Sequence, residues 1–275
     1  ATLGYGGNTL EMLKKLDSKG HLYSLDIDSI ELPKTKERLE KLGYGSDILT
    51  TKQLNFSDID EVVLESGLLN FVLADLGVSS MQIDNPERGF SYKKNGPLDL
   101  RMNPEIGIPA STRIRRLSQE ALEGMLIENA DEPHAEVISK AIVKEIKNGM
   151  HIDTTTKLQN IIKNALQFVH PSSRDNEIKK SCQRTFQALR IDVNREFESI
   201  YNFLEKLPDV LAKDGRVAIL SFHSGEDRLV KKSFKRLLRE GVYKEISSEI
   251  IRPTLEECNI NRRARSTKMR WAIKA

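Results

Sequence analysis

Short apolar segments alternate with amphipathic helical patterns in the first part of the chain, and this alternation constrains its fold more than any other feature. Apolar runs at 22–25, 48–54 and 71–74 predict strands, and the spacing of the leucines between them predicts helices. A repeated strand–helix order is typical of a parallel sheet covered by helices. We interpret Ala1-Thr2-Leu3 as the end of a first strand whose beginning is absent, followed by a helix at about 8–16.

Three of the predicted strands end in residues that suit a nucleotide-type cofactor. Gly4-Tyr5-Gly6-Gly7 follows the first strand, Asp26 ends the second, and Asp75 follows the run at 71–74. In parallel α/β proteins, ligands bind at the edge of the sheet where the carboxyl ends of the strands meet. Glycines at such an edge let the backbone approach a ligand closely. The sequence therefore predicts a cofactor cleft at these three strand ends.

The strand–helix alternation stops after Gln82. Residues 137–146 and 158–169 carry apolar side chains at helical spacing, and no convincing buried strand appears before 216–222. An all-helical domain inserted into the sheet domain explains this gap. The helical stripes are interpreted as the core of that domain rather than as a cofactor site.

Sheet architecture is predicted to resume after the insert. One long helix is expected there, with an apolar face formed by Phe186, Leu189, Val193, Phe197, Ile200 and Leu204. Strands at 216–222 and 269–273 then complete the sheet. The expected fold class is α/β, with a Rossmann-like sheet and an inserted all-helical small domain. The expected boundaries are 1–83 and 184–275 for the two parts of the sheet domain and 84–183 for the insert.

Composition excludes several classes of protein. A chain of 275 residues, 39% hydrophobic and 30% charged, is typical of a globular enzyme. No apolar run approaches the roughly 20 residues that span a bilayer, and no signal pattern opens the chain, so we expect a cytoplasmic protein without membrane contact. Cys182 and Cys258 have no metal-ligand spacing, and the five histidines are scattered. Neither a disulfide nor a metal site is predicted.

The formal net charge of +3 conceals an uneven distribution of charge. Residues 179–190 hold four basic and no acidic side chains, and residues 228–239 and 262–274 hold six basic side chains each, again without an acidic one. Single-sign segments of this kind favour a surface that binds a polyanion such as nucleic acid. The alternative is that they are ordinary solvated faces of helices.

Seven motifs, in one order over almost the whole chain, resemble the MraW (RsmH) family. They are Thr2–Gly7, Asp75–Gln82, Glu87–Ser91, Gly96–Met102, Arg184–Ile191, Ser221–Arg228 and Ala264–Ser266. The resemblance implies a class I methyltransferase sheet and a bacterial enzyme dependent on S-adenosylmethionine. It also implies a substrate, N4 of a cytidine in the decoding region of 16S ribosomal RNA in the small subunit. The sequence leaves open whether the protein forms a homodimer.

The resemblance and the chemistry of the cofactor together give a set of candidate binding residues. They are Gly6, Gly7, Asn8, Asp26, Phe56, Asp75 and Gln82. Gly6 and Gly7 suit the methionine end of the cofactor, Asp26 can accept from both ribose hydroxyls, and Phe56 can lie against the adenine. The alternatives are a plain tight turn for the glycines and a core position for Phe56.

This chain departs from the family pattern at three places. Asn8 stands where the family usually has His, and Gly225 stands where the family commonly has Leu. Residues 129–136 match poorly. These departures leave open a paralogue with altered target choice.

Asp75 and His223 are the candidate catalytic residues. An exocyclic cytosine amine is a poor nucleophile, and an acceptor beside its hydrogens promotes methyl transfer without a covalent intermediate or a metal. Asp75, with the adjacent Ser79-Ser80 loop, is placed to be that acceptor; its alternative is a structural acid that caps the following turn. His223 can contact the base or accept a proton. Its alternative is a loop residue that organises Asp227 and Arg228.

Chemistry on a base edge requires the nucleotide to leave its stack, so the flanking phosphates must be held. Four basic residues are predicted for this task, namely Arg184, Arg190, Arg228 and Arg265. Other functions stay open. An oxidoreductase is disfavoured because Gly4-Tyr5-Gly6-Gly7-Asn8-Thr9 lacks the last glycine of the dinucleotide motif. A methyltransferase acting on another nucleic acid or a protein amine, and a cofactor-binding RNA-binding protein without turnover, are the remaining alternatives.

Overall fold

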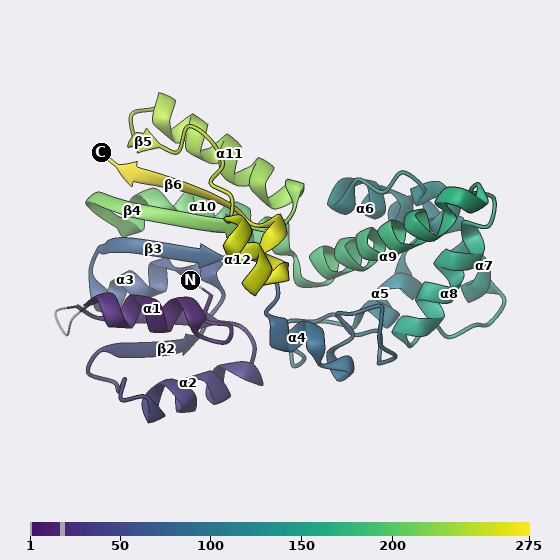
Figure 1. Cartoon of the computed structure of the whole chain (residues 1–275), viewed down its shortest axis with the longest axis horizontal. Helices are drawn as coiled ribbons and strands as arrows, with labels where there is room; N and C mark the ends of the chain where they lie inside the picture. Colours follow the sequence, from purple (N-terminus) through teal and green to yellow (C-terminus); the bar gives the residue numbers. More distant parts are fainter. Residues whose placement is uncertain (1, 17–19) are drawn as a thin grey trace. The chain divides into compact units, whose positions relative to one another are not determined.

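The computed structural model describes residues 2–16 and 20–275, and the chain separates into two compact units (Figure 1). The first, the sheet unit, combines the chain up to Gly77 with Phe197–Ala275. The second, the helical unit, is Val78–Glu196. Ala1, which the sequence assigns to the end of a first strand, lies outside the described residues.

Every strand assigned among the described residues belongs to the sheet unit. The strands predicted at 22–25, 48–54, 71–74, 216–222 and 269–273 are confirmed as β1, β2, β3, β4 and β6, whereas Thr2 and Leu3 are not assigned to a strand. β5 is a short strand that the sequence did not indicate. Helices flank the strands on both faces (Figure 1). The strands are β1 (Leu22–Asp26), β2 (Leu49–Gln53), β3 (Leu69–Asp75), β4 (Leu211–Ser221), β5 (Tyr243–Ile246) and β6 (Lys268–Lys274). The helices of this unit are α1 (Gly7–Leu16), α2 (Glu31–Lys41), α3 (Asp60–Ser66), α10 (Glu196–Val210), α11 (Ser224–Arg239) and α12 (Leu255–Ile260).

The strands form two sheets, whereas the sequence indicated one parallel sheet. β1 and β2 pair in parallel, and a second sheet has the order β3-β4-β6-β5, in which only β3 and β4 are parallel. Thr2 and Leu3 lie between the two sheets: Leu3 N donates to Leu25 O at 2.7 Å, and the Thr2 hydroxyl donates to Asp75 O at 2.6 Å. These contacts reach only the carboxyl ends of β1 and β3. Further along, an open groove lined by both strands separates them.

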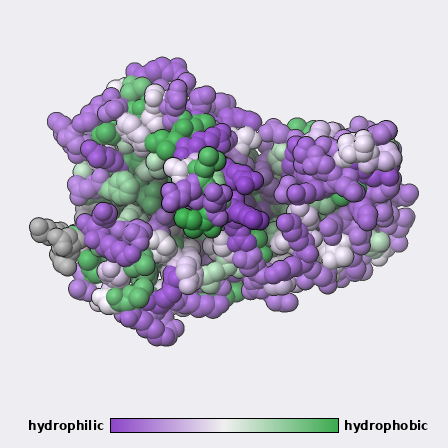
Figure 2. Space-filling view, in the orientation of Figure 1, coloured by the Kyte–Doolittle hydropathy of each residue, from purple (hydrophilic) through white to green (hydrophobic). Residues whose placement is uncertain are grey.

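Two apolar clusters support the sheet unit. The larger one buries α10 and α11 against β3 and β4 and includes Phe203 and Phe234. The smaller one joins Leu3 to Leu13 of α1, Leu39 of α2 and Leu49 of β2. α12 buries none of its residues, and its Leu255 and Ile260 are exposed. Figure 2 shows apolar surface near its centre, where Figure 1 places α12.

The helical unit has a core of its own, in which Ile138 and Ile142 of α7 and Leu158 and Ile162 of α8 are fully buried. The predicted helical stripes at 137–146 and 158–169 correspond to these two helices. The elements of this unit are α4 (Ser80–Asp84), α5 (Ala110–Arg116), α6 (Gln119–Ala130), α7 (Ala135–Lys147), α8 (Thr155–Ala165) and α9 (Pro171–Asn194). No helix among the described residues is long and apolar enough to cross a membrane.

The single long helix predicted over Phe186–Leu204 is wrong, because the chain breaks at Arg195. This residue has left-handed backbone angles (φ 50°, ψ 42°) and separates α9 from α10. As a result, Phe186 packs into the core of the helical unit, whereas Leu204 packs into the core of the sheet unit. α9 continues unbroken past residue 183, so the helical unit extends to Glu196.

Candidate cofactor and active site

The glycine turn before α1 has left-handed backbone angles at two of its glycines, Gly4 (φ +51°) and Gly6. Gly6 has φ +76°, and a Cβ atom there would lie 2.9 Å from Cγ2 of Thr35 on α2. Apart from its chain neighbours and the backbone of its own helix, Gly7 has no described atom within 4 Å of the place where its Cβ would be. The Thr35 hydroxyl donates to Gly4 O at 2.8 Å and so ties the turn to α2. Gly6 is needed for the fold, whereas the open space beside Gly7 suits a ligand.

Asp26, at the end of β1, holds the same turn from the other side. Its Oδ2 accepts a hydrogen bond from Gly4 N at 2.8 Å, and its Oδ1 accepts one from Asp28 N at 2.9 Å. Burial raises the pKa of the Asp26 carboxyl, and these backbone bonds act in the opposite direction. Each carboxylate oxygen can accept a second hydrogen bond. Asp26 can therefore brace the turn and still accept from a ligand hydroxyl.

Asp75, at the end of β3, has a different environment. Asn8 Nδ2, in the first turn of α1, donates to Asp75 Oδ2 at 2.9 Å. Asp75 Oδ1 is buried and has no hydrogen-bond partner among the described residues. Burial raises the pKa of Asp75 to about 6; the Asn8 bond lowers this pKa and the charge of Glu226 raises it. A buried acceptor without a partner costs free energy, so this oxygen marks a site for an incoming donor.

Tyr5 and Arg38 form a contact at the glycine turn that the sequence reasoning missed. The Arg38 guanidinium carbon lies 3.3 Å from the centre of the Tyr5 ring, which is 55% exposed. A cation stacked on an aromatic ring is attracted by its negative face. The position of Tyr5 inside the glycine turn was the available signal, but nothing in the sequence pairs it with a residue on α2.

Phe56 follows β2 and begins a short 3₁₀ helix, Phe56–Asp58. Its half-buried ring packs edge-on against Phe203, with 5.3 Å between the ring centres. The ring is thus part of the packing around the larger core cluster and is only partly buried. Its contact with adenine stays a prediction.

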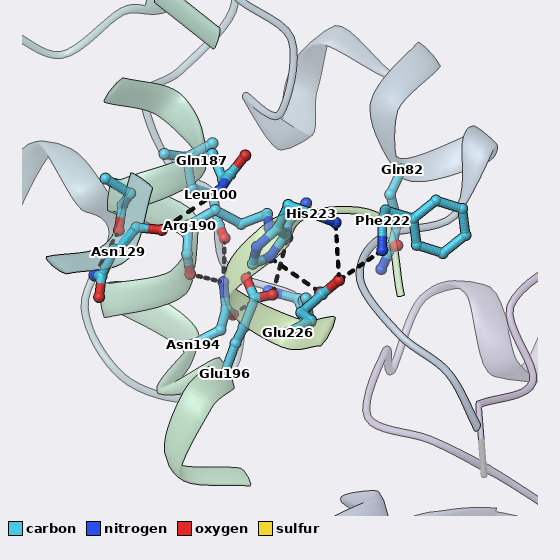
Figure 3. Close-up of polar contacts among 12 residues, drawn as sticks. Gln82, Leu100, Asn129, Gln187, Arg190, Asn194, Glu196, Phe222, His223 and Glu226 are labelled. Atoms are coloured by element: carbon cyan, nitrogen blue, oxygen red, sulfur yellow. Dashed lines mark hydrogen bonds and ion pairs between the residues drawn. The ribbon is translucent and has the colours of Figure 1, made fainter. Parts of the chain in front are cut away.

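His223 precedes α11 and lies beside a buried carboxylate. Its Nε2 is 3.1 Å from Oε1 of Glu226, whose side chain is fully buried. Glu226 Oε2 accepts from Phe222 N at 2.7 Å and from His223 N at 3.4 Å (Figure 3). Asp227 does not serve as the partner of this ring; it forms a buried ion pair with Arg270, at 2.7 Å. Glu226 therefore caps α11 and places its second oxygen beside the His223 ring.

Gly225 is packed closely by Phe197. A Cβ atom at Gly225 would lie 2.6 Å from Cζ of Phe197, and the Phe197 ring also lies beside His223, with 5.8 Å between the ring centres. Any larger side chain at position 225 therefore requires Phe197 to move. At Gly225, where this chain departs from the family pattern, the Phe197 ring thus occupies the space that a larger side chain would need.

Gln82, in the helical unit, is 6% exposed and takes part in a capping box at the start of α4. Ser79 N donates to Gln82 Oε1 at 2.7 Å, and Gln82 N donates to Ser79 Oγ at 3.3 Å. This reciprocal pair fixes the loop that follows Asp75 in the sequence. These hydrogen bonds do not test the predicted contact of Gln82 with the cofactor, which stays a prediction.

The four predicted RNA-binding arginines differ in how far their side chains are exposed. Arg190 donates to both carboxylate oxygens of Glu196, at 2.7 and 2.9 Å (Figure 3). Arg184 is partly buried, 4.0 Å from Glu132. Arg228 on α11 and Arg265, between α12 and β6, are exposed. The described residues contain no group of three or more His, Cys, Asp or Glu side chains that could hold a metal ion.

A glycine turn beside parallel strands that end in two partly buried carboxylates is a feature of the mixed α/β folds that bind nucleotide-type cofactors. Within that class, the chain belongs to the MraW methylase family, whose model matches residues 1–275. The resemblance found in the motifs is thereby confirmed.

Curated relatives support the same family. The chain is 71% identical, over 100% of its length and 79% of the relative's length, to ribosomal RNA small subunit methyltransferase H 2 of Alkaliphilus metalliredigens. It is 68% identical, over 100% of its length and 75% of the relative's, to ribosomal RNA small subunit methyltransferase H 1 of Lachnoclostridium phytofermentans. A more distant relative, from Prochlorococcus marinus, is 38% identical and is named ribosomal RNA small subunit methyltransferase H.

Proposed function

We propose that this protein transfers a methyl group from S-adenosylmethionine to N4 of a cytidine in the decoding region of 16S ribosomal RNA. The names of its relatives support small-subunit ribosomal RNA as the substrate. The observation that carries the chemistry is the Asp75 carboxylate, which ends a strand beside the glycine turn and keeps one buried oxygen without a partner.

The residues of the sheet unit fit the cofactor. S-adenosylmethionine, when bound, supplies an electrophilic methyl group. The amides at the start of α1 lack partners within the helix, and the open space beside Gly7 leaves room for the methionine end. Asp26 has acceptor capacity left for the ribose hydroxyls. Phe56 is only partly buried, so part of its side chain is left for the adenine.

Asp75 has the chemistry that an amine substrate needs. Above a pH of about 6 its carboxyl is ionised, and Oδ1 can accept a hydrogen bond from the cytosine amine. That bond draws the nitrogen lone pair out of conjugation with the ring and takes up charge as the new bond forms. His223, held by Glu226, is proposed to contact the target base.

RNA binding is assigned to exposed cations. Arg228 and Arg265 are exposed and suit phosphate contacts, whereas Arg190 is paired with Glu196 and Arg184 is only partly exposed. We propose that the helical unit serves as the inserted substrate-recognition domain. We expect a cytoplasmic enzyme, since bacteria assemble small ribosomal subunits there.

The decisive experiment measures methyl transfer from labelled S-adenosylmethionine to purified small subunits that lack this class of modification, with mass mapping of the product. Label at N4 of a decoding-region cytidine is the expected result, and Asp75→Asn is the matched inactive control. Label on another nucleotide or on protein would replace this proposal with a paralogue of different target. Cofactor binding by calorimetry without any transfer would identify a binding protein without turnover.

Gly7→Ala tests the position of the cofactor separately. The folded protein has room for the added methyl group, so the thermal unfolding midpoint should stay within about 2 °C of wild type. If the cofactor occupies that space, its Kd should rise about tenfold in calorimetry. An unchanged Kd would show that no ligand approaches Gly7.

A further inference from the structure

We propose that Asn8 is a positioning residue, whose side-chain amide holds one oxygen of the Asp75 carboxylate and leaves the other as the free acceptor for the substrate amine. This inference rests on the proposed function, because it concerns the same carboxylate. It assigns to Asn8 a task different from the direct cofactor contact that the sequence implied.

The geometry of the contact is specific. Asn8 Nδ2 lies 2.9 Å from Asp75 Oδ2, although the two residues are 67 positions apart in the chain. The backbone of Asp75 is also fixed, because Thr2 Oγ1 accepts from Asp75 N at 3.0 Å and donates to Asp75 O at 2.6 Å. With the backbone held by Thr2 and one oxygen held by Asn8, the direction of the second oxygen is determined.

The charges around this carboxyl give the amide a second effect. Asn8 is the only side chain among the described residues that donates to the Asp75 carboxylate, and Glu226 on α11 adds a repulsive negative charge. A hydrogen bond to the ionised form favours ionisation, whereas burial and a neighbouring negative charge oppose it. Asn8 therefore keeps Asp75 in the acceptor form near neutral pH. A side-chain amide does so at every working pH, since it carries no titrating proton.

The test compares three variants by two measurements. Asn8→Ala removes the donor, Asn8→His restores a donor, and Asn202→Ala removes an exposed asparagine from α10 as the matched control. The first measurement is the pKa of Asp75 in the free protein, from a carbon NMR titration of labelled aspartate, with Asp75→Asn identifying the signal. The second is the pH profile of kcat/KM for the cofactor, which reports on the free enzyme.

We expect Asn8→Ala to raise the pKa of Asp75 by about one unit, the lower end of the effect of a hydrogen bond to a charged group. From a starting value of about 6, kcat/KM should then fall about fivefold at pH 6, about twofold at pH 7 and hardly at all at pH 8. Asn202→Ala should keep the wild-type profile within about 0.3 units, whereas Asn8→His should restore the donor and, where its imidazole is protonated, lower the pKa of Asp75 relative to Asn8→Ala. A purely structural role for Asn8 would lower kcat/KM equally at all pH values.

The outcomes separate this inference from the proposed function. An unchanged titration of Asp75 in Asn8→Ala, in a protein that melts like wild type, would overturn the role of Asn8 even if methyl transfer to RNA is observed. The expected titration shift without any transfer by the wild type would overturn the proposed function and leave the assignment of Asn8 to Asp75 standing.

Discussion

The carboxyl ends of β1 and β3 both carry an aspartate, yet the two side chains have opposite hydrogen-bonding states. Both oxygens of Asp26 accept from backbone amides, whereas Asp75 has one donor, Asn8, and one buried oxygen without a partner. Burial raises the pKa of both groups, but it raises that of Asp75 to about 6. A carboxylate with a donor on each oxygen is suited to hold a turn and a ligand, and one with an oxygen that has no donor is suited to receive one during a reaction. The same residue type therefore serves two purposes in this site.

The largest effect should come from Asp75→Asn. Removing the charged acceptor while keeping the shape should lower kcat by at least about 100-fold, in the range expected for loss of an acid–base group. The Kd for S-adenosylmethionine should change less than about threefold, as measured by calorimetry. Retained turnover with normal cofactor affinity would remove Asp75 from catalysis and make the two carboxylates equivalent.

The same substitution should stabilise the fold. The folded-state pKa of Asp75, about 6, lies above its ordinary value of 3.8, so this group's contribution to stability is greatest below about pH 4 and is lost as the pH rises through 6. Asp75→Asn removes the buried charge and should raise the free energy of unfolding by about 2 kcal/mol at pH 8, and by almost nothing at pH 4. Urea titrations at the two pH values measure this difference. Equal changes in the free energy of unfolding at pH 4 and pH 8 would mean that burial of the Asp75 charge has no cost.

Asp26→Asn should weaken cofactor binding more than turnover, which is the reverse of the effect expected from Asp75→Asn. One amide hydrogen would then face the amide of Gly4 or Asp28, which loosens the glycine turn. We expect the Kd for the cofactor to rise about tenfold, while kcat at saturating cofactor stays within about threefold of wild type. A large loss of kcat with unchanged Kd would reverse the roles assigned to the two carboxylates.

The smallest effect is expected from Thr35→Val, which removes the hydroxyl that donates to Gly4 O and keeps the side-chain shape. It should lower the free energy of unfolding by about 1 kcal/mol. Thr185→Val is the matched control, since Thr185 is fully buried and its hydroxyl has no hydrogen-bond partner among the described residues. That control should be neutral or slightly stabilising in the same urea titration. Equal losses in both would show that the bond to Gly4 does not brace the turn.

The basic segments show what a count of charges along the chain can predict and what it misses. Their single-sign composition predicted a cationic surface, and Arg228 and Arg265 are exposed as that prediction requires. Arg190 and Arg270, however, are committed to Glu196 and Asp227, which lie outside their own segments. A count of charges along the chain does not include such partners, so it overstates the free positive charge.

Local sequence determined the strands, the glycine turn and the acids that end the strands, because side-chain periodicity and turn chemistry act over a few residues. The break at Arg195 escaped that reasoning, since no glycine or proline interrupts the helical pattern there. Only the tertiary structure decided that Asn8 meets Asp75 and that Gly4 meets Asp26. Those contacts join residues far apart in the chain, and an aspartate has a donor on both oxygens or on only one of them according to which donors the folded backbone brings to it.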